Sequence, residues 1–343
     1  MMKIKRELKK LGIKPIEELS VQERTSIAER VATKLVSLNV PGITHNEILE
    51  KLFSAKMYTS EISKNLGKVK YFYQNKTIYF DKIVNLFELD ENILHECIHY
   101  IQDKREKTKK MGLCTFEQYK VRGMALNEIG ITYISNKLLK QNNNNKIFTL
   151  LKQILLITGE EVFFDSILNN SNSFQEKFME KINSENLFLK MQNTFDAMFD
   201  LEQIIKRLNL EGRKSSNPQR YLAKINMHKH TLNSKFAEVQ WDIYNRYFSR
   251  KIEIIDKVDD IKEYKEELFN FNQYLEISED ELKYTNFIKE KVEKLNRIEA
   301  ELVINETNNS MILVDNNILQ KIIRNIKRTI YKTKQNKENT LNI

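Results

Sequence analysis

Apolar residues recur every three or four positions through most of this chain, and that period is typical of amphipathic α-helices. Over residues 21–39, for example, Ile27, Val31 and Leu35 fall on one helical face. The same spacing predicts further helices over 45–55, 90–107, 115–140, 146–170, 173–208, 218–250, 259–275 and 279–304, and a basic helix at the end of the chain. The pattern therefore predicts a predominantly α-helical protein.

One stretch departs from the helical period. Residues 71–80, YFYQNKTIYF, alternate aromatic and β-branched side chains around Gln74-Asn75, which is typical of two strands joined by a tight turn. A second, shorter extended patch is expected at Met311–Val314. We therefore expect an α+β fold, with a small N-terminal β-sheet or hairpin ahead of the 90–107 helix and a helical C-terminal part.

Glycine and proline are scarce, with eight and three residues in 343, so long helices with few sharp turns are expected. The run from Glu211-Gly212 through Pro218 is the clearest linker in the sequence. We expect three parts on this basis: an N-terminal helical segment over 1–57, a core over 58–210 and a helical C-terminal region over 211–343.

The formal charge of +9 is spread along helices in which Lys and Glu alternate, as in IKEYKEELFNF. That arrangement is typical of solvated helix faces, so a nucleic-acid partner is not expected, even for the basic tail from Lys321 to Lys337. The N-terminus has no apolar core of a signal peptide, and no apolar run is long enough to cross a membrane. Two cysteines make no disulfide framework. We expect a cytoplasmic protein without a membrane partner, of an oligomeric state that the sequence leaves open.

Two of the five histidines lie four positions apart in the run His95-Glu96-Cys97-Ile98-His99. Residues i and i+4 share one face of a helix, so both imidazoles can reach one metal ion with Glu96 beside it. This HExxH spacing is that of zinc hydrolases, in which the glutamate is the general base. By the same period Cys97 lies on the opposite face, where we expect a small buried side chain.

A catalytic zinc ion needs a third protein ligand and an open position for water. Glu128 is the preferred donor, because the helical period puts it on one face with Met124 and Thr132 in an otherwise apolar stretch. A buried carboxylate needs a partner, and a metal ion is one. The alternatives left open are Glu160, Glu161, His228, His230 and Cys114.

The order of strand, HExxH helix and Asn127-Glu128 helix, over about residues 60–145, resembles the gluzincins, the thermolysin-like zinc metallopeptidases. In that group the downstream glutamate often belongs to an NExxxD pattern, in which this chain has Thr132 at the aspartate position. Asp103 falls where such enzymes often carry an acid that supports a ligand histidine. The spacing from His99 to Glu128 is longer than in the thermolysin type, which implies a distinct subfamily.

The resemblance implies a zincin-like core and a Zn²⁺ ion held by His95, His99 and Glu128, with Glu96 as general base. Family members also place a Tyr or a downstream His near the developing oxyanion, and Tyr119, His228 and His230 are the matching candidates.

The substrate expected from the resemblance is a peptide or protein. Its backbone would lie antiparallel to an edge strand at Thr77–Phe80. A GxMEN-like segment, which binds the substrate amino terminus in related aminopeptidases, is absent from the sequence, so an endopeptidase is preferred. Two other functions remain as alternatives: a catalytically inactive zincin-type module that binds zinc and a protein, and a basic helical nucleic-acid-binding protein in which the motif is incidental.

Overall fold

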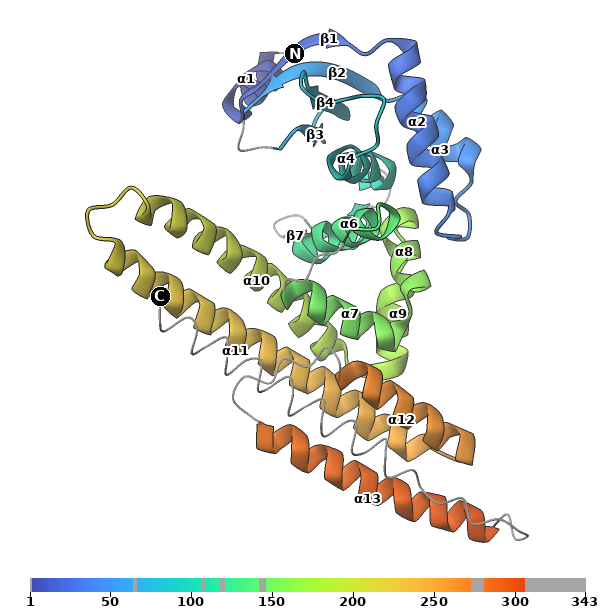
Figure 1. Cartoon of the computed structure of the whole chain (residues 1–343). Coiled ribbons are helices and arrows are strands. Elements are labelled where there is room, and N and C mark those ends of the chain that lie inside the picture. Colours follow the sequence, from blue (N-terminus) through green and yellow to red (C-terminus); the bar gives the residue numbers. More distant parts are fainter. Residues whose placement is uncertain are drawn as a thin grey trace. The chain divides into compact units, whose positions relative to one another are not determined.

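The computed structural model (Figure 1) is an α+β structure in which helices predominate. It describes residues 2–63, 67–105, 109–117, 121–141, 146–272 and 281–305. The extended patch expected at 311–314 and the basic helix expected at the end of the chain lie outside these residues. Within the described part, no helix is long and apolar enough to span a membrane.

The chain divides into two compact units. Unit 1 contains residues 1–148 and 159–177, and unit 2 contains residues 149–158 and 178–343. The boundaries expected at 57/58 and 210/211 do not coincide with these units. Strand β2 (Lys56–Ile62) crosses the first boundary and pairs with β1 (Ile13–Glu18), so the N-terminal segment is part of the same sheet as the rest of unit 1.

The second expected boundary lies in a helical hairpin of unit 2. Helices α10 (Glu185–Gly212) and α11 (Pro218–Lys251) lie side by side (Figure 1) and are joined by the short turn that we had expected to be a linker. Asn217 caps α11, its side chain accepting the N–H of Arg220. Gly and Pro mark a turn whether or not two domains meet there, which is why the sequence suggested a boundary.

The sheet of unit 1 has the strand order β1-β2-β4-β3. The expected hairpin is confirmed: β3 (Val69–Phe72) pairs antiparallel with β4 (Thr77–Asp81), and Tyr71 lies opposite Ile78. Strand β4 also pairs with β2, in parallel. The expectation that 77–80 forms the edge strand is therefore wrong, because β2 covers that side and β3 is at the edge.

Three helices flank the first two strands along the chain: α1 (Met2–Leu11) precedes β1, and α2 (Val21–Val36) and α3 (His45–Phe53) lie between β1 and β2. Both α2 and α3 begin with capping boxes, in which a Ser or Thr and a Glu three residues later satisfy each other's backbone N–H groups. The sequence did not predict α1, β1 or β2. Strand β1 shows no alternation because all its residues after Ile13 are exposed.

The motif helix α4 (Glu91–Gln102) starts at Asp90, whose side chain accepts the N–H of Ile93 at 2.9 Å. It ends five residues earlier than expected. A second, three-stranded sheet follows, formed by β5 (Lys110–Met111), β6 (Cys114–Phe116) and β7 (Val121–Arg122), and only then α6 (Met124–Leu138). The helix expected over 115–140 therefore begins later, because the segment before Gly123 is extended.

The helices expected over 146–170 and 173–208 are each divided in two: α7 (Lys146–Thr158) and α8 (Glu160–Asn169), then α9 (Ser173–Ile182) and α10. The breaks occur at Gly159 and Asn183, whose positive φ angles end a helix. In unit 2, α12 (Val258–Asn272) and α13 (Glu281–Asn305) follow the short helix η2 (Ile252–Ile254). Aromatic rings of Tyr244, Phe248 and Phe271 form the core there.

Candidate metal centre

Helices α4 and α6 of unit 1 bring three ligand-type side chains together. His95 and His99 lie one turn apart on α4, and their Nε2 atoms are 3.1 Å apart. Glu128 extends from α6 so that Oε2 is 3.3 Å from Nε2 of His95 and Oε1 is 3.2 Å from Nε2 of His99. Within the part of the chain that the structure describes, this is the one group of three such residues close enough to share a metal ion.

These separations can be compared with those required around zinc. Ligand atoms about 2.0–2.1 Å from a tetrahedral zinc ion are about 3.3 Å from one another. The two imidazole nitrogens are close to that separation, and each lies near it from a different oxygen of the Glu128 carboxylate; with one ligand atom per residue, all three lie within 4.8 Å of one another. A His₂Glu set leaves one coordination position for water. The three side chains therefore fit a zinc ion in donor type and are close enough to share one.

The carboxylate and the two imidazoles of this group stabilise one another. Burial alone would raise the pKa of the Glu128 carboxyl, but hydrogen bonds and charge from His95 and His99 outweigh it and hold the pKa well below its usual range. Burial would likewise lower the pKa of His99, yet Glu128 raises it. Glu128 thus supplies a negative charge to a site whose His99 side chain is only 5% exposed.

Thr132, at the position where NExxxD sequences have aspartate, lies beside His95. Its hydroxyl donates to the Glu128 carbonyl oxygen at 3.0 Å, and the same Oγ1 lies 3.5 Å from Nδ1 of His95. A hydroxyl whose proton is used this way offers its lone pairs to an Nδ1–H group. This contact favours the tautomer of His95 that leaves Nε2 available for a metal ion.

Asp103, by contrast, does not support a ligand histidine. Its carboxylate accepts hydrogen bonds from the Tyr71 hydroxyl at 2.7 Å and from the Arg105 guanidinium, at 2.9 Å for Nε. Among the described residues, the buried Nδ1 of His99 has no hydrogen-bond partner. Asp103 instead joins the end of α4 to strand β3, because the helix ends at Gln102 and turns the carboxylate away from the histidines.

Glu96 lies on the side of α4 that faces β3. Its Oε2 accepts the backbone N–H of Tyr71 at 2.8 Å, and its Oε1 accepts a hydrogen bond from the Lys70 ammonium at 3.2 Å. The side chain is 8% exposed, whereas that of Lys70 is 39% exposed. Lys70 could not be predicted from the sequence, because its pairing with Glu96 depends on how the sheet edge meets the helix.

A pair of buried amides, the amide clamp of Gln102 and Asn127, fixes α6 against α4. The Asn127 amide nitrogen donates to Oε1 of Gln102 at 3.0 Å, and the Gln102 amide nitrogen donates to Oδ1 of Asn127 at 3.2 Å. The Leu113 N–H also donates to Oδ1 of Asn127, at 3.0 Å. Asn127 precedes Glu128 directly, so the clamp positions the third ligand. Its signal in the sequence is an Asn in an otherwise apolar helix stretch.

Other residues predicted for the site are not brought to this group of three side chains in the described part of unit 1. Tyr119 lies outside the described residues. His228 is half-buried and His230 exposed on α11, in unit 2, and their predicted role stays a prediction.

The alternative third ligands within unit 1 have other surroundings. Glu160 accepts hydrogen bonds from Tyr133 and Lys137, and Glu161 lies in the first turn of α8. Cys114 is buried in β6. Cys97 is fully buried on α4, as expected, and burial raises the pKa of its thiol.

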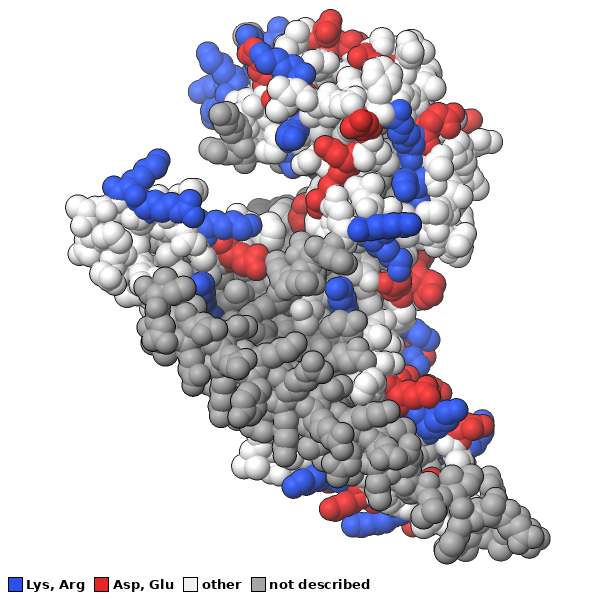
Figure 2. Space-filling model, in the orientation of Figure 1, with Lys and Arg blue, Asp and Glu red and all other residues white. Residues whose placement is uncertain are grey.

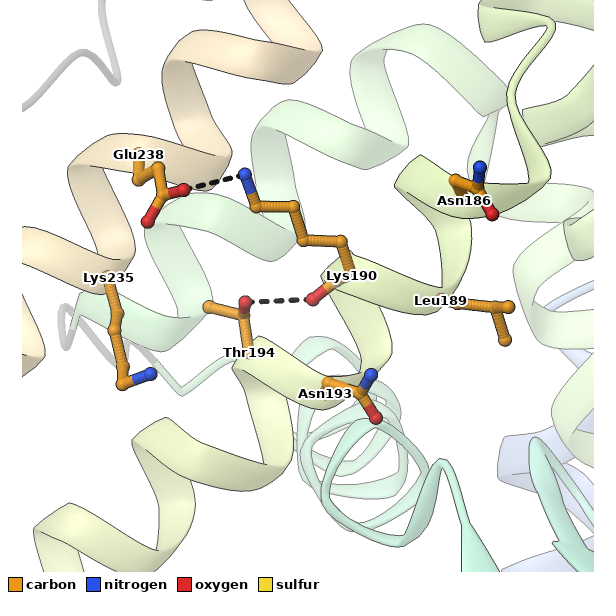
Figure 3. A pocket seen from close by; sticks show the side chains of 7 residues that line it. All are labelled: Asn186, Leu189, Lys190, Asn193, Thr194, Lys235 and Glu238. Carbon is orange, nitrogen blue, oxygen red and sulfur yellow. Dashed lines mark hydrogen bonds and ion pairs between the residues drawn. The ribbon is translucent and has the colours of Figure 1, made fainter.

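Unit 2 has a separate surface hollow of about 360 Å³ between α10 and α11 (Figure 3). Lys190 there pairs with Glu238 at 2.8 Å, and the Thr194 hydroxyl donates to the Lys190 carbonyl oxygen at 2.8 Å. The ion pair of Lys190 and Glu238 thus joins the two helices of the hairpin. The chemistry expected from the sequence lies in unit 1 instead.

Comparison with known proteins gave no match: no family model, no curated protein and no solved structure is similar to this chain. Function is therefore inferred from the geometry of unit 1. Its central element is the triangle of His95, His99 and Glu128, with Glu96 adjoining it in sequence.

Proposed function

We propose that this chain is a zinc-dependent peptidase of the gluzincin type, preferentially an endopeptidase. The observation that carries the proposal is the close approach of His95, His99 and Glu128: the two histidine Nε2 atoms are 3.1 Å apart, and each lies 3.2–3.3 Å from one oxygen of the Glu128 carboxylate. The histidines lie on α4, the helix that also carries Glu96, and Glu128 lies on α6. Two imidazoles and a carboxylate are a donor set that suits zinc. The zincin-like core is part of the same proposal, supported by an edge strand that runs antiparallel to its neighbour and contacts the motif helix.

Each residue has a defined task in the proposed reaction. His95, His99 and Glu128 would hold zinc, which when bound supplies a water of lowered pKa and polarises the peptide carbonyl. Glu96 would accept the proton of that water and deliver it to the leaving amine. Its two oxygens each receive one hydrogen bond, from Tyr71 and Lys70, so the carboxylate is fixed in direction and keeps further lone pairs for the proton.

The backbone of the edge strand β3 favours an extended peptide as the substrate. The N–H of Asp81 donates to the Lys68 carbonyl, so by alternation Lys70 and Phe72 direct their backbone groups toward β4. Tyr71 and Tyr73 then direct theirs outward. The Tyr71 N–H is used by Glu96 and the Tyr73 carbonyl by Arg105. The Tyr71 carbonyl and the Tyr73 N–H remain as outward groups with which an extended peptide would pair.

One observation favours the second candidate, a catalytically inactive module that binds zinc and a protein. Glu96 is engaged by both the strand backbone and Lys70, which would suit a structural role as well as a catalytic one. The nucleic-acid alternative has less support. Blue Lys and Arg side chains are interspersed with red Asp and Glu side chains on the face shown in Figure 2.

Metal analysis and a single substitution test the proposal. Purified protein should contain about one zinc per chain, and His99→Ala or Glu128→Ala should lose it. Glu96→Gln should keep zinc while hydrolysis of an unfolded protein falls about 10²-fold or more. Glu88→Gln, an exposed glutamate before α4, is the matched control and should retain activity.

The outcomes separate the candidates. Zinc binding with an inert wild-type protein on a broad peptide mixture would favour the inactive module. A folded wild-type protein that takes up no zinc would contradict both zinc-dependent functions. Retention on DNA that falls with salt, together with absent zinc, would favour the nucleic-acid alternative.

A further inference from the structure

A polar pocket of about 530 Å³ lies in unit 1 where the β3–β4 turn meets the end of α4. We call it the Arg105 pocket. Its lining residues come from that turn and from the two positions that follow the helix: Tyr73, Gln74, Asn75, Lys76, Asp103 and Arg105. None of the three metal-ligand candidates lines the pocket, and it was not predicted from the sequence.

Two cationic side chains and one carboxylate line this pocket. The Asp103 side chain is only 2% exposed and its carboxylate is engaged by Arg105 and the Tyr71 hydroxyl, whereas the Arg105 side chain is 20% exposed. Lys76 adds a second cation. A group entering the pocket therefore meets the guanidinium and not the carboxylate behind it.

The guanidinium of Arg105 is held in place and still has donors to offer. Nε and Nη2 bind Asp103, and Nη2 also donates to the Tyr73 carbonyl at 3.1 Å. Its carbon lies 4.5 Å from the centre of the Tyr73 ring. Nη1 has no hydrogen-bond partner among the residues that the structure describes and is not among the buried unpartnered atoms. A fixed guanidinium with free N–H groups is a ready site for a carboxylate.

The position of the pocket follows from strand β3. Tyr71 contacts Glu96 through its backbone, and Tyr73, two residues later, contacts Arg105 through its backbone. Tyr73 is the first residue of the turn that follows β3, so it lies at most about 7 Å along the chain from Tyr71. A peptide antiparallel to β3, with its scissile bond near Tyr71 and Glu96, would pass Tyr73 with residues on the N-terminal side of that bond.

We propose that the Arg105 pocket is a specificity subsite for an Asp or Glu side chain, two or three residues before the scissile bond. This inference rests on the proposed peptidase function and names a substrate class for it. The substrate carboxylate would accept hydrogen bonds from Nη1 of Arg105, with the Lys76 ammonium as a second positive charge.

The first test uses short peptides blocked at both ends, in which Asp replaces Asn, or Glu replaces Gln, at one position at a time. We expect kcat/KM to rise about tenfold or more for the acidic residue at the second or third position before the cleaved bond. Other positions should show smaller effects. The inference would be overturned if the acidic peptide and its amide counterpart had equal kcat/KM at both of these positions, or if Lys were preferred there. The peptidase function would remain intact in either case.

Variants then assign the effect to the pocket. Lys76→Asn removes a charge from a residue whose φ angle is 51°, a conformation that Asn tolerates, and should reduce the preference for acidic peptides. Lys140→Asn is the matched control, since Lys140 likewise has a positive φ angle but is exposed just beyond the end of α6, away from the pocket lining. Arg105→Gln should abolish the preference.

A binding measurement keeps the inference testable if Arg105→Gln folds poorly. Zinc-loaded Glu96→Gln protein is titrated with fluorescently labelled forms of the Asp peptide and its Asn counterpart, and the Asp peptide should bind about tenfold more tightly. Adding Lys76→Asn should reduce this difference in affinity. An unchanged difference would show that the pocket does not bind the carboxylate. Absence of any hydrolysis by the wild-type protein would instead count against the peptidase proposal itself.

Discussion

Replacing Asn127 by Ala removes one half of the amide clamp that joins α6 to α4. Asn127 is only 1% exposed, and its amide takes part in three hydrogen bonds, two with Gln102 and one with the Leu113 N–H. The substitution leaves no polar atom of its own, but it removes the partners of groups that stay buried. We therefore expect loss of both stability and metal affinity.

The magnitude follows from which groups lose every partner that the structure gives them. The Gln102 amide nitrogen keeps its bond to the Ile167 carbonyl at 3.3 Å, whereas Oε1 of Gln102 and the Leu113 N–H lose theirs. A buried group left without a partner costs about 1–3 kcal/mol. Oε1 of Gln102 is such a group, and the part-buried Leu113 N–H adds a smaller cost. Asn127→Ala should therefore lower the free energy of unfolding by about 2–4 kcal/mol. Displacement of the adjacent Glu128 should weaken zinc binding about 10- to 100-fold.

Two measurements check these values. Urea unfolding of the zinc-free protein gives the change in stability, and competition with a chromogenic chelator gives the zinc affinity. Ser135→Ala is the matched control on the same helix: Ser135 is fully buried, and its hydroxyl has no hydrogen-bond partner in the described structure. That variant should change the unfolding free energy by less than about 1 kcal/mol. The reasoning fails if Asn127→Ala costs no more stability than Ser135→Ala.

Three further predictions follow from other contacts. Lys70→Met should leave the zinc content unchanged but lower kcat several-fold, because Glu96 loses one of its two fixed donors. Lys70→Arg should retain much of the wild-type kcat. Equal kcat values for the wild type and the two variants would contradict the positioning role. Burial opposes ionisation of Asp103, but Arg105 and Tyr71 outweigh it and lower the pKa of its carboxyl below the ordinary value of 3.8. The contribution of Asp103 to stability is therefore complete above about pH 4 and is lost as the pH falls through the lowered pKa. Below about pH 4 the free energy of unfolding of Asp103→Asn should therefore vary less with pH than that of the wild-type protein. Urea titrations at several pH values measure this. Cys97 and Cys114 are both buried, so neither should react with a thiol reagent at neutral pH until urea unfolds the protein; rapid labelling of the native protein would contradict the packing of α4 and β6.

Local features of the fold could be predicted well from the sequence. The β-hairpin and the helical face shared by His95 and His99 depend on residues close together in the chain. Side-chain alternation and the helical period describe such features directly. Strand β1 was missed for the opposite reason: its residues are almost all exposed, so no alternating pattern exists to detect.

Long-range pairing could not be predicted in the same way. The identity of the edge strand depends on β2, which pairs with β4 from an earlier part of the chain and so leaves β3 at the edge of the sheet. Asp103 was expected to support a histidine, but the turn at the end of α4 directs it to Tyr71 and Arg105. Both differences arise because the direction of a side chain depends on neighbours that are distant in the sequence.

The period of the helix places His95, Glu96 and His99 together on one helix, so this part of the site can be inferred from local spacing. Which carboxylate meets the two histidines depends on how the helices pack. Glu128 does so because the amide clamp of Gln102 and Asn127 joins α6 to α4. The tertiary structure also decided that Glu96 faces Lys70 and Tyr71, because the sheet edge, and not the helix, supplies those partners.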